Sequence, residues 1–277
     1  MKTLLSALLL TASCHVLAEC KPFRGLKGVV SLEQCAAGDN CVRAAEALFK
    51  YAGMKTEENQ DPTTLVVFMH ASPWRFYDKE NRIVSIEDIA KMVRPDIKGK
   101  VNRIILKASW SGVPPAHGEK SLASKLSEAL GGFPVEGADG FLWIAEDGST
   151  RTSHQAFTVF IGELYKIPAG RELFISMVVG WPASYEEAFL RDKNSEGINA
   201  AGEAWDTFYL CPERALRAFE TAARYDNPIA AYNAALIRLE RKSKGDLKAA
   251  TALLSQAAKA GDQKAQTRLA MLSKQPR

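Results

Sequence analysis

Two residue types that carry hydrolytic chemistry stand at the ends of apolar runs in this sequence. His70 follows the run TLVVFM, and Ser109 follows the run RIILKA. Such runs are typical of strands buried on both faces of a parallel sheet. Because the carboxyl ends of parallel strands open into one crevice, the side chains at 70 and 109 are expected to meet there. A histidine beside a hydroxyl is a combination that can activate a nucleophile.

The layout around these residues resembles that of caspase-like peptidase domains. The segment SLASKLSEALGGFPVEGADGFLW follows the second run. In that family a histidine closes one parallel strand, a nucleophilic cysteine closes its neighbour, and a helix and a small-residue turn come next. The resemblance implies that His70 is the base and that position 109 is the nucleophile. This sequence departs from the family there, because Ser109 stands in place of the thiol and no Gly-x-Ser-x-Gly elbow surrounds it.

A serine at this place needs more help than a cysteine would. It has no appreciable anionic form at neutral pH, and it depends on a base that a third group orients. The alternative is structural, with His70 as a satisfied core or rim histidine and Ser109 as a hydrogen-bonding residue at a strand end. We favour the structural interpretation and predict a non-catalytic α/β scaffold. The competing hypothesis is a hydrolase that uses His70 with Ser109 or Ser111.

An aromatic cluster follows the first predicted strand. Its members are Trp74, Arg75, Phe76, Tyr77 and, close by if the two strands are neighbours, Trp110. If these side chains are exposed, they suit a protein-contact hot spot; if they are buried, they are core residues. The sequence leaves both readings open.

The pattern predicts no metal site and no cofactor. His117 and His154 are isolated in polar segments and lack the ligand spacing of zinc sites. Asp139 lies between glycines and is expected in a tight turn.

The order of apolar runs and helical patterns predicts the elements that position these residues. Strands alternate with helices, which favours a Rossmann-like α/β domain around a mainly parallel sheet over residues 19–210. The expected strands are 65–69, 101–108, 141–145, 156–161 and 173–179, and the expected helices are 39–53, 86–92 and 122–130.

Residues 211–277 differ in composition, because alanine-rich helical patterns replace the strands. A first set of helix-face positions recurs 35 residues later, as Ala215 and Ala250 or Ala230 and Ala265 illustrate. A period of this length with paired helices is typical of a tetratricopeptide-like solenoid. The segment GDLKAATALLSQAAKAGDQKAQTRLAML resembles a Sel-like repeat. Two repeats bury too little surface to stand alone, so they are expected to pack on the α/β domain.

The first 18 residues are expected to be a cleavable signal peptide. Lys2 precedes a short apolar stretch, and Val16-Leu17-Ala18 supplies a small-residue cleavage site. Lipidation at Cys14 is the weaker alternative, since Leu10 lies one place too far upstream for a good lipobox. No later run is long enough to span a membrane. We therefore expect a periplasmic protein.

Four cysteines remain after removal of the leader: Cys20, Cys35, Cys41 and Cys211. An even number in an oxidising compartment indicates two disulfides, for which three pairings exist. Local geometry favours Cys35–Cys41, which closes a short loop, and Cys20–Cys211, which ties the N-terminal arm to the end of the main domain.

The composition excludes several function classes. Among 277 residues, 47% are hydrophobic and 25% are charged, which is ordinary for a globular protein. The formal net charge is only +4, and the sequence has no block of Lys and Arg of the kind that binds a phosphate backbone. Nucleic acid is therefore not expected as a partner.

The whole pattern resembles the periplasmic immunity proteins of type VI secretion phospholipase effectors, some of which carry Sel-like repeats. The resemblance implies a non-enzymatic inhibitor that binds a cognate phospholipase through a preformed surface. Two other functions stay open: a hydrolase, and an envelope scaffold that binds partners through its helical repeats.

Overall fold

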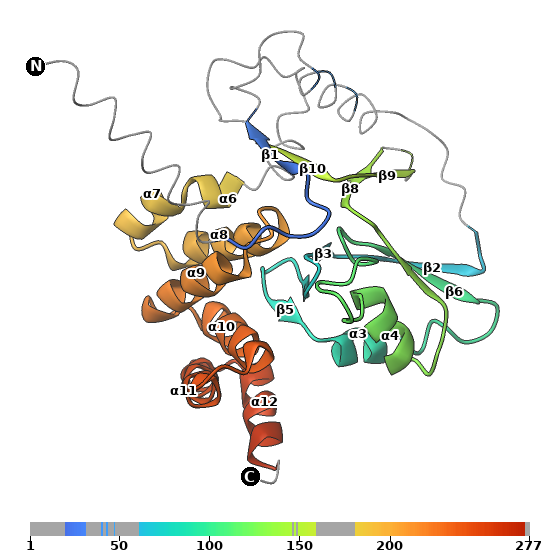
Figure 1. Ribbon diagram of the computed structural model, residues 1–277. Coiled ribbons are helices and arrows are strands. Elements are labelled where there is room, and N and C mark those ends of the chain that lie inside the picture. The colour runs from blue at the N-terminus through green and yellow to red at the C-terminus, as the bar shows by residue number, and fades with distance from the viewer. Residues whose placement is uncertain are drawn as a thin grey trace, which may run out of the picture.

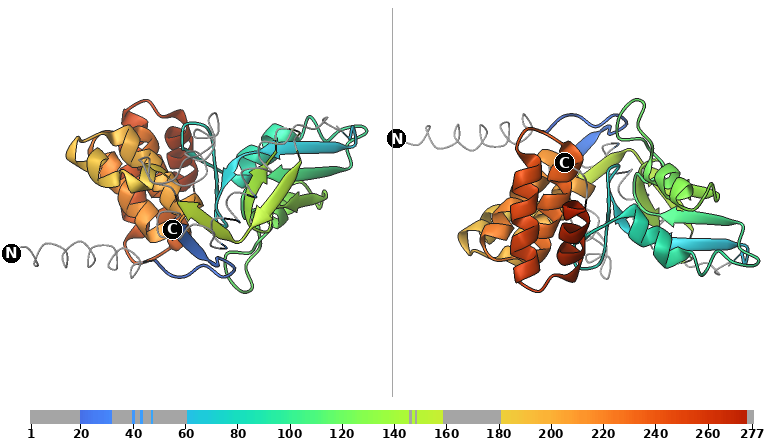
Figure 2. Two further views of the ribbon diagram at one scale, coloured as in Figure 1. Left: turned by 90° about the horizontal axis from the view of Figure 1, so that it is seen from above. Right: turned by 90° about the horizontal axis from the view of Figure 1, so that it is seen from below.

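The computed structural model describes residues 20–31, 40, 43, 47, 61–145, 147, 149–158 and 181–274. They form an α/β part up to residue 158 and a helical part from residue 181 (Figure 1). Views from above and below show the two parts side by side (Figure 2). Outside the described residues lie the predicted leader, Cys14, Cys35, Cys41, the predicted strand 173–179 and, apart from single residues, the predicted helix 39–53.

The apolar runs form a small parallel sheet. Its strands are β2 (Thr64–Phe68), β6 (Arg103–Lys107) and β7 (Val135–Gly137), in the order β2-β6-β7. Helices α3 (Ile86–Val93) and α4 (Leu122–Ala129) pack against one face of this sheet. On the other face Val66 and Phe68 are exposed. The expectation of strands buried on both faces is therefore wrong for β2.

The third strand of this sheet is not the predicted one. The run 141–145 was expected as the next strand after 101–108, but Val135–Gly137 pairs with β6 instead. Two glycines make this possible, because a Cβ on Gly137 would lie 2.5 Å from the backbone nitrogen of Gly112. The backbone after β7 thus passes directly over the loop after β6, a close approach that only glycine allows.

The remaining strands form three small sheets. β8 (Phe141–Ile144) pairs antiparallel with β9 (Thr150–Ser153), and β3 (His70–Ala71), β4 (Phe76–Tyr77) and β5 (Ile83–Val84) form an antiparallel meander. β10 (Gln155–Thr158) pairs in parallel with β1 (Gly28–Ser31).

Serine caps begin both helices of the α/β part. Ser85 accepts a hydrogen bond from the backbone nitrogen of Asp88, and Ser121 accepts one from that of Ser124. Each cap satisfies a backbone donor that the first helical turn leaves free. The predicted helices 86–92 and 122–130 are confirmed to within one residue.

The helical part starts about 30 residues earlier than the alanine-rich pattern indicated. It comprises α6 (Trp181–Ser184), α7 (Glu186–Arg191), α8 (Ser195–Thr207), α9 (Pro212–Arg224), α10 (Pro228–Arg241), α11 (Asp246–Lys259) and α12 (Gln263–Ser273). A Cβ on Gly202 of α8 would lie 2.6 Å from the ring of Phe219 on α9. The glycine therefore lets these two helices approach closely.

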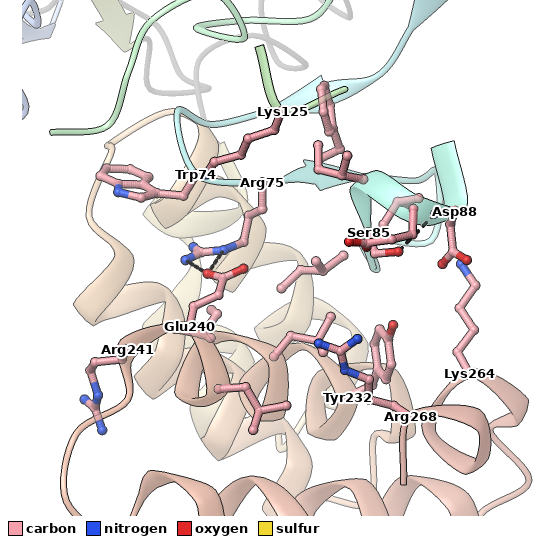
Figure 3. A pocket seen from close by; sticks show the side chains of 18 of the residues that line it. Trp74, Arg75, Ser85, Asp88, Lys125, Tyr232, Glu240, Arg241, Lys264 and Arg268 are labelled. Atoms are coloured by element: carbon pink, nitrogen blue, oxygen red, sulfur yellow. Dashed lines mark hydrogen bonds and ion pairs between the residues drawn. The ribbon is translucent and has the colours of Figure 1, made fainter. Parts of the chain in front are cut away.

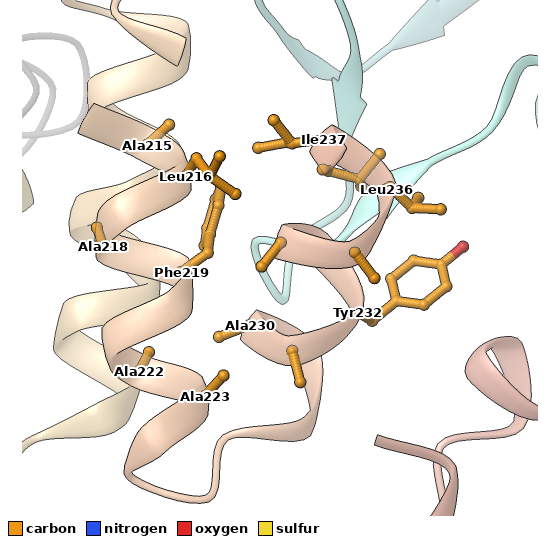
Figure 4. Packing of buried hydrophobic residues seen from close by; sticks show 14 of the residues in the cluster. Ala215, Leu216, Ala218, Phe219, Ala222, Ala223, Ala230, Tyr232, Leu236 and Ile237 are labelled. Carbon is orange, nitrogen blue, oxygen red and sulfur yellow. The ribbon is translucent and has the colours of Figure 1, made fainter. Parts of the chain in front are cut away.

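Alanines 35 residues apart occupy equivalent buried positions in the helical part. Ala215 and Ala250 are completely buried, and so are Ala230 and Ala265. Figure 4 shows the first set of small side chains between α9 and α10. The capping residues follow the same spacing, because Asn227 caps α10 and Asp262 caps α12. Each side chain accepts a hydrogen bond from the backbone nitrogen three residues further along the chain.

A disulfide joins the two parts. Cys20 in the N-terminal arm is bonded to Cys211 at the start of α9, with 5.1 Å between the Cα atoms. The predicted Cys20–Cys211 pair is confirmed. Phe23, three residues further along the arm, packs edge-to-face on Trp74 and Trp110 of the α/β part. The arm is thus held both covalently and by aromatic packing.

Candidate functional site

His70 lies on β3 and faces the helical part. Its Nδ1 atom is 2.8 Å from Oε1 of Glu203 on α8. This hydrogen bond raises the pKa of His70 above its ordinary value, and it outweighs the lowering that partial burial brings. The imidazole is 61% exposed, whereas the Glu203 side chain is 11% exposed. His70 is therefore oriented by a carboxylate of the neighbouring part of the molecule.

The two candidate serines bond to backbone. The Ser109 hydroxyl accepts a hydrogen bond from the backbone nitrogen of Leu142. The buried Ser111 hydroxyl donates to the carbonyl of Ala108 and accepts from the nitrogen of Ala138. In the part of the chain that the structure describes, neither hydroxyl is hydrogen-bonded to His70. Both serines hold the end of β6 against the segment that leads into β8.

The aromatic cluster is mostly core. Arg75, Phe76, Tyr77 and Trp110 are all buried, so the reading as core residues applies to them and the reading as an exposed hot spot does not. Trp110 packs among Phe23, Phe141 and His154. Trp74 is the partly exposed member of the set.

A buried polar junction connects the loop between β3 and β4 to the helices. It consists of Ser72, Arg75, Tyr77, Asp206 and Glu240. Asp206 is fully buried and accepts from the Ser72 hydroxyl at 2.7 Å, the Arg75 guanidinium at 2.6 Å and the Tyr77 hydroxyl at 3.0 Å. Arg75 also donates to Glu240 through Nε at 3.1 Å and Nη2 at 2.7 Å.

The electrostatics of the polar junction raise the pKa values of Arg75 and Tyr77. Burial alone would lower the pKa of Arg75, but attraction to Asp206 and Glu240 holds that pKa well above its ordinary value. Burial raises the pKa of Tyr77, with Asp206 adding to the effect, so the phenol stays protonated and donates. The junction is one charge-assisted network without an unpaired ion.

A second set of contacts holds β5 against α10. The Asn233 side chain accepts from the backbone nitrogen of Ile83 at 2.8 Å and donates to the carbonyl of Asn81 at 2.7 Å. Arg82 forms an ion pair with Asp262 and lies over the ring of Tyr232. The two parts of the molecule are therefore joined at several separate points.

Between these contacts lies a cleft of about 980 Å³, which we call the α3–α12 cleft (Figure 3). One wall comes from Trp74, β5 and α3, and the other comes from α10 and α12. The floor is apolar, with Ile83, Leu216 and Leu236. A cavity of this size at the boundary between two parts of a fold is a usual place for ligand binding.

Charged side chains border the apolar floor of the cleft. They include Glu87, Asp88, Lys91, Lys125, Glu213, Glu240, Arg241, Lys242, Lys264 and Arg268. Figure 3 shows Trp74 and Arg241 at one end, and Asp88 and Lys264 at the other.

The sequence reasoning missed the junction and the cleft. One signal was available for the junction, because Glu203 and Asp206 are three residues apart within the apolar segment AAGEAWD. Carboxylates on the buried face of a helix require partners. No local pattern points to the cleft, since its walls come from segments far apart in the sequence.

The described residues hold neither a metal-binding cluster nor a membrane-spanning helix. They contain no group of three or more histidine, cysteine or acidic side chains arranged to hold a metal ion. Among their helices, none combines the length and apolar composition that a membrane crossing requires.

Comparison with known proteins identifies similarity in the α/β part. A family model described as a domain of unknown function, DUF8616, matches residues 39–152. That range includes His70, Ser109 and the three junction residues Ser72, Arg75 and Tyr77, and it ends before the helical part begins. No curated protein and no solved structure matches the chain.

Proposed function

We propose that this chain is an exported binding protein that inhibits a protein partner by direct contact. One observation supports this most strongly: the two hydroxyls that could act as nucleophiles are engaged elsewhere. The hydroxyls of Ser109 and Ser111 bond to backbone groups, and within the described residues neither is hydrogen-bonded to His70. These hydrogen bonds hold segments of the protein together.

Export is supported by the disulfide. A bond between Cys20 and Cys211 is typical of proteins that fold in an oxidising compartment. We propose the periplasm as that compartment, with cleavage of the leader just before Glu19, next to the disulfide-bonded Cys20.

For the partner we propose a phospholipase effector of a type VI secretion system, as the resemblance to immunity proteins implies. A preformed surface favours tight inhibition, because little conformational freedom is lost on binding. The multiple connections between the α/β part and the helical part support such a rigid surface.

The test is a titration of a purified phospholipase effector from the same genome with the mature protein. An inhibitor should abolish lipid hydrolysis at about one equivalent, and its gene should protect cells that carry the effector in the periplasm. The Ser109→Ala variant should inhibit as well as the wild type. Inhibition that develops with time, below one equivalent and only with Ser109 intact, would instead support the hydrolase.

A further inference from the structure

We propose that the α3–α12 cleft binds an extended peptide segment of the protein partner, one that carries an acidic side chain beside an apolar one. The inference rests on the proposed function and names the part of the partner that is recognised. Four features of the cleft support it: buried polar atoms without hydrogen-bond partners, an apolar floor beside a charged wall, a length that suits a short peptide, and walls that are fixed relative to each other.

Two polar atoms in the cleft lining are buried without a hydrogen-bond partner among the residues that the structure describes. One is the donor Nε of Arg268 on α12, and the other is the acceptor Oε2 of Glu213 on α9. Buried polar groups are nearly always bonded, so such a pair calls for an explanation. An extended peptide carries carbonyl oxygens and N–H groups along its backbone and can satisfy one atom of each kind.

The α12 wall favours a carboxylate. Lys264 and Arg268 are four residues apart and therefore lie on one face of the helix, toward the cleft. Burial raises the pKa of the nearby Tyr232 to about 12, so its hydroxyl stays protonated. Glu87 and Asp88 stand on the opposite, α3 wall, and the Lys264 side chain extends toward Asp88 (Figure 3), so an incoming acidic side chain is placed against Arg268.

The apolar floor favours a neighbouring hydrophobic side chain. Ile83, Leu216 and Leu236 lie at the bottom, and Met271, 53% exposed, lines the rim. Buried apolar contacts of this kind supply affinity, whereas the charges fix position and direction. A free inorganic anion would use only the charged wall.

The dimensions suit a short extended segment. Tyr232 and Arg241, which lie toward opposite ends of α10, are nine residues apart, or about 14 Å along the helix axis. An extended chain advances about 3.3 Å per residue, so about four residues fit along the cleft.

The walls of the cleft are fixed relative to each other. The polar junction ties the two walls together through Arg75 and Glu240, and the Arg82–Asp262 pair joins the residue before β5 to the N-cap of α12. A site with fixed walls is preorganised for its ligand.

The test is fluorescence anisotropy of the full mature protein with labelled peptides. The probe is a fluorescein-labelled hexapeptide of alternating Leu and Asp, and its matched control has Lys in place of Asp. We expect micromolar binding of the Asp peptide and at least tenfold weaker binding of the Lys peptide. Arg268→Gln should weaken binding of the Asp peptide about tenfold, because a charge-assisted hydrogen bond is lost.

A control variant outside the cleft, a second cleft variant and a free dicarboxylate make the result decisive. Lys248→Gln, on the exposed face of α11 outside the cleft, should leave binding unchanged. Met271→Glu places a negative charge at an exposed rim position and should weaken binding without affecting folding. Equal binding of the two peptides, unchanged binding by both cleft variants, or equal affinity for free succinate would each overturn the inference.

The outcome separates this inference from the proposed function. If the Arg268→Gln and Met271→Glu variants still inhibit the effector with wild-type affinity, the cleft is not the recognition site although the protein is an inhibitor. If the wild type binds the Asp peptide selectively but inhibits no effector, the proposed function fails and the cleft inference stands.

Discussion

Arg75 and Asp206 form an ion pair of 2.6 Å between two buried side chains that are 131 residues apart in the sequence. One comes from the loop between β3 and β4, and the other comes from α8. Because a family model covers the first and not the second, this contact joins two regions that differ in their similarity to known proteins.

Removal of Arg75 should destabilise the protein strongly. Arg75→Ala leaves Asp206 buried without its cation, a change that costs about 3 to 5 kcal/mol of unfolding free energy. Urea denaturation of the mature protein measures the loss. Arg224→Ala, at an exposed position of α9, is the matched control and should stay within about 0.5 kcal/mol of the wild type. A loss no larger than that of the control would mean that the pair adds nothing to stability.

The His70–Glu203 contact should make stability depend on pH. The pKa of His70 is raised in the folded protein, so the pair contributes fully below the unfolded value of about 6.5 and is lost as pH rises through the folded value. Because the imidazole is largely exposed, the contribution should stay below about 1 kcal/mol. NMR titration should show the His70 pKa falling when Glu203 is replaced by Gln. An identical titration curve in Glu203→Gln would refute this assignment.

Loss of the disulfide should lower stability while leaving the two cores intact. The Cys20→Ser/Cys211→Ser double variant removes a covalent bond between residues that are 191 positions apart. Such a loss typically lowers the free energy of unfolding by about 2 to 5 kcal/mol. Thermal unfolding compares the variant with the oxidised wild type. Peptide mapping under non-reducing conditions provides the control, and a Cys20 peptide linked to Cys35 or Cys41 would contradict the observed pairing.

The two candidate serines should differ in their structural importance. Ser111→Ala removes two hydrogen bonds at a buried site and leaves the nitrogen of Ala138 and the carbonyl of Ala108 with fewer partners, for a cost of about 1 to 3 kcal/mol. Ser109→Ala removes one bond and should cost about 1 kcal/mol. Chemical denaturation of both variants tests the order. A reversed order would show that the hydroxyl of Ser109 has a further role.

Much of the local structure could be predicted from the sequence. The apolar runs at 65–69 and 101–108 marked β2 and β6, Ser85 marked the start of α3, and the helical pattern from Leu122 marked α4. The candidate site could not be predicted in the same way. Its walls depend on which distant segments come together, and the pairing of β7 with β6 shows that even the neighbours of a strand were not predicted from the apolar runs.

What the sequence determined by itself was the type and approximate extent of β2, β6, α3 and α4, the 35-residue spacing of the last helices and the candidate disulfide. These features depend on periodicity, capping and residue counts, which act over a few neighbouring residues or can be read directly. Only the tertiary structure decided that His70 is paired with Glu203, that Arg75 and Tyr77 are buried against Asp206, and that a cleft remains beside them. The physical reason is that burial and ion pairing are set by contacts between segments more than one hundred residues apart, which no local pattern encodes.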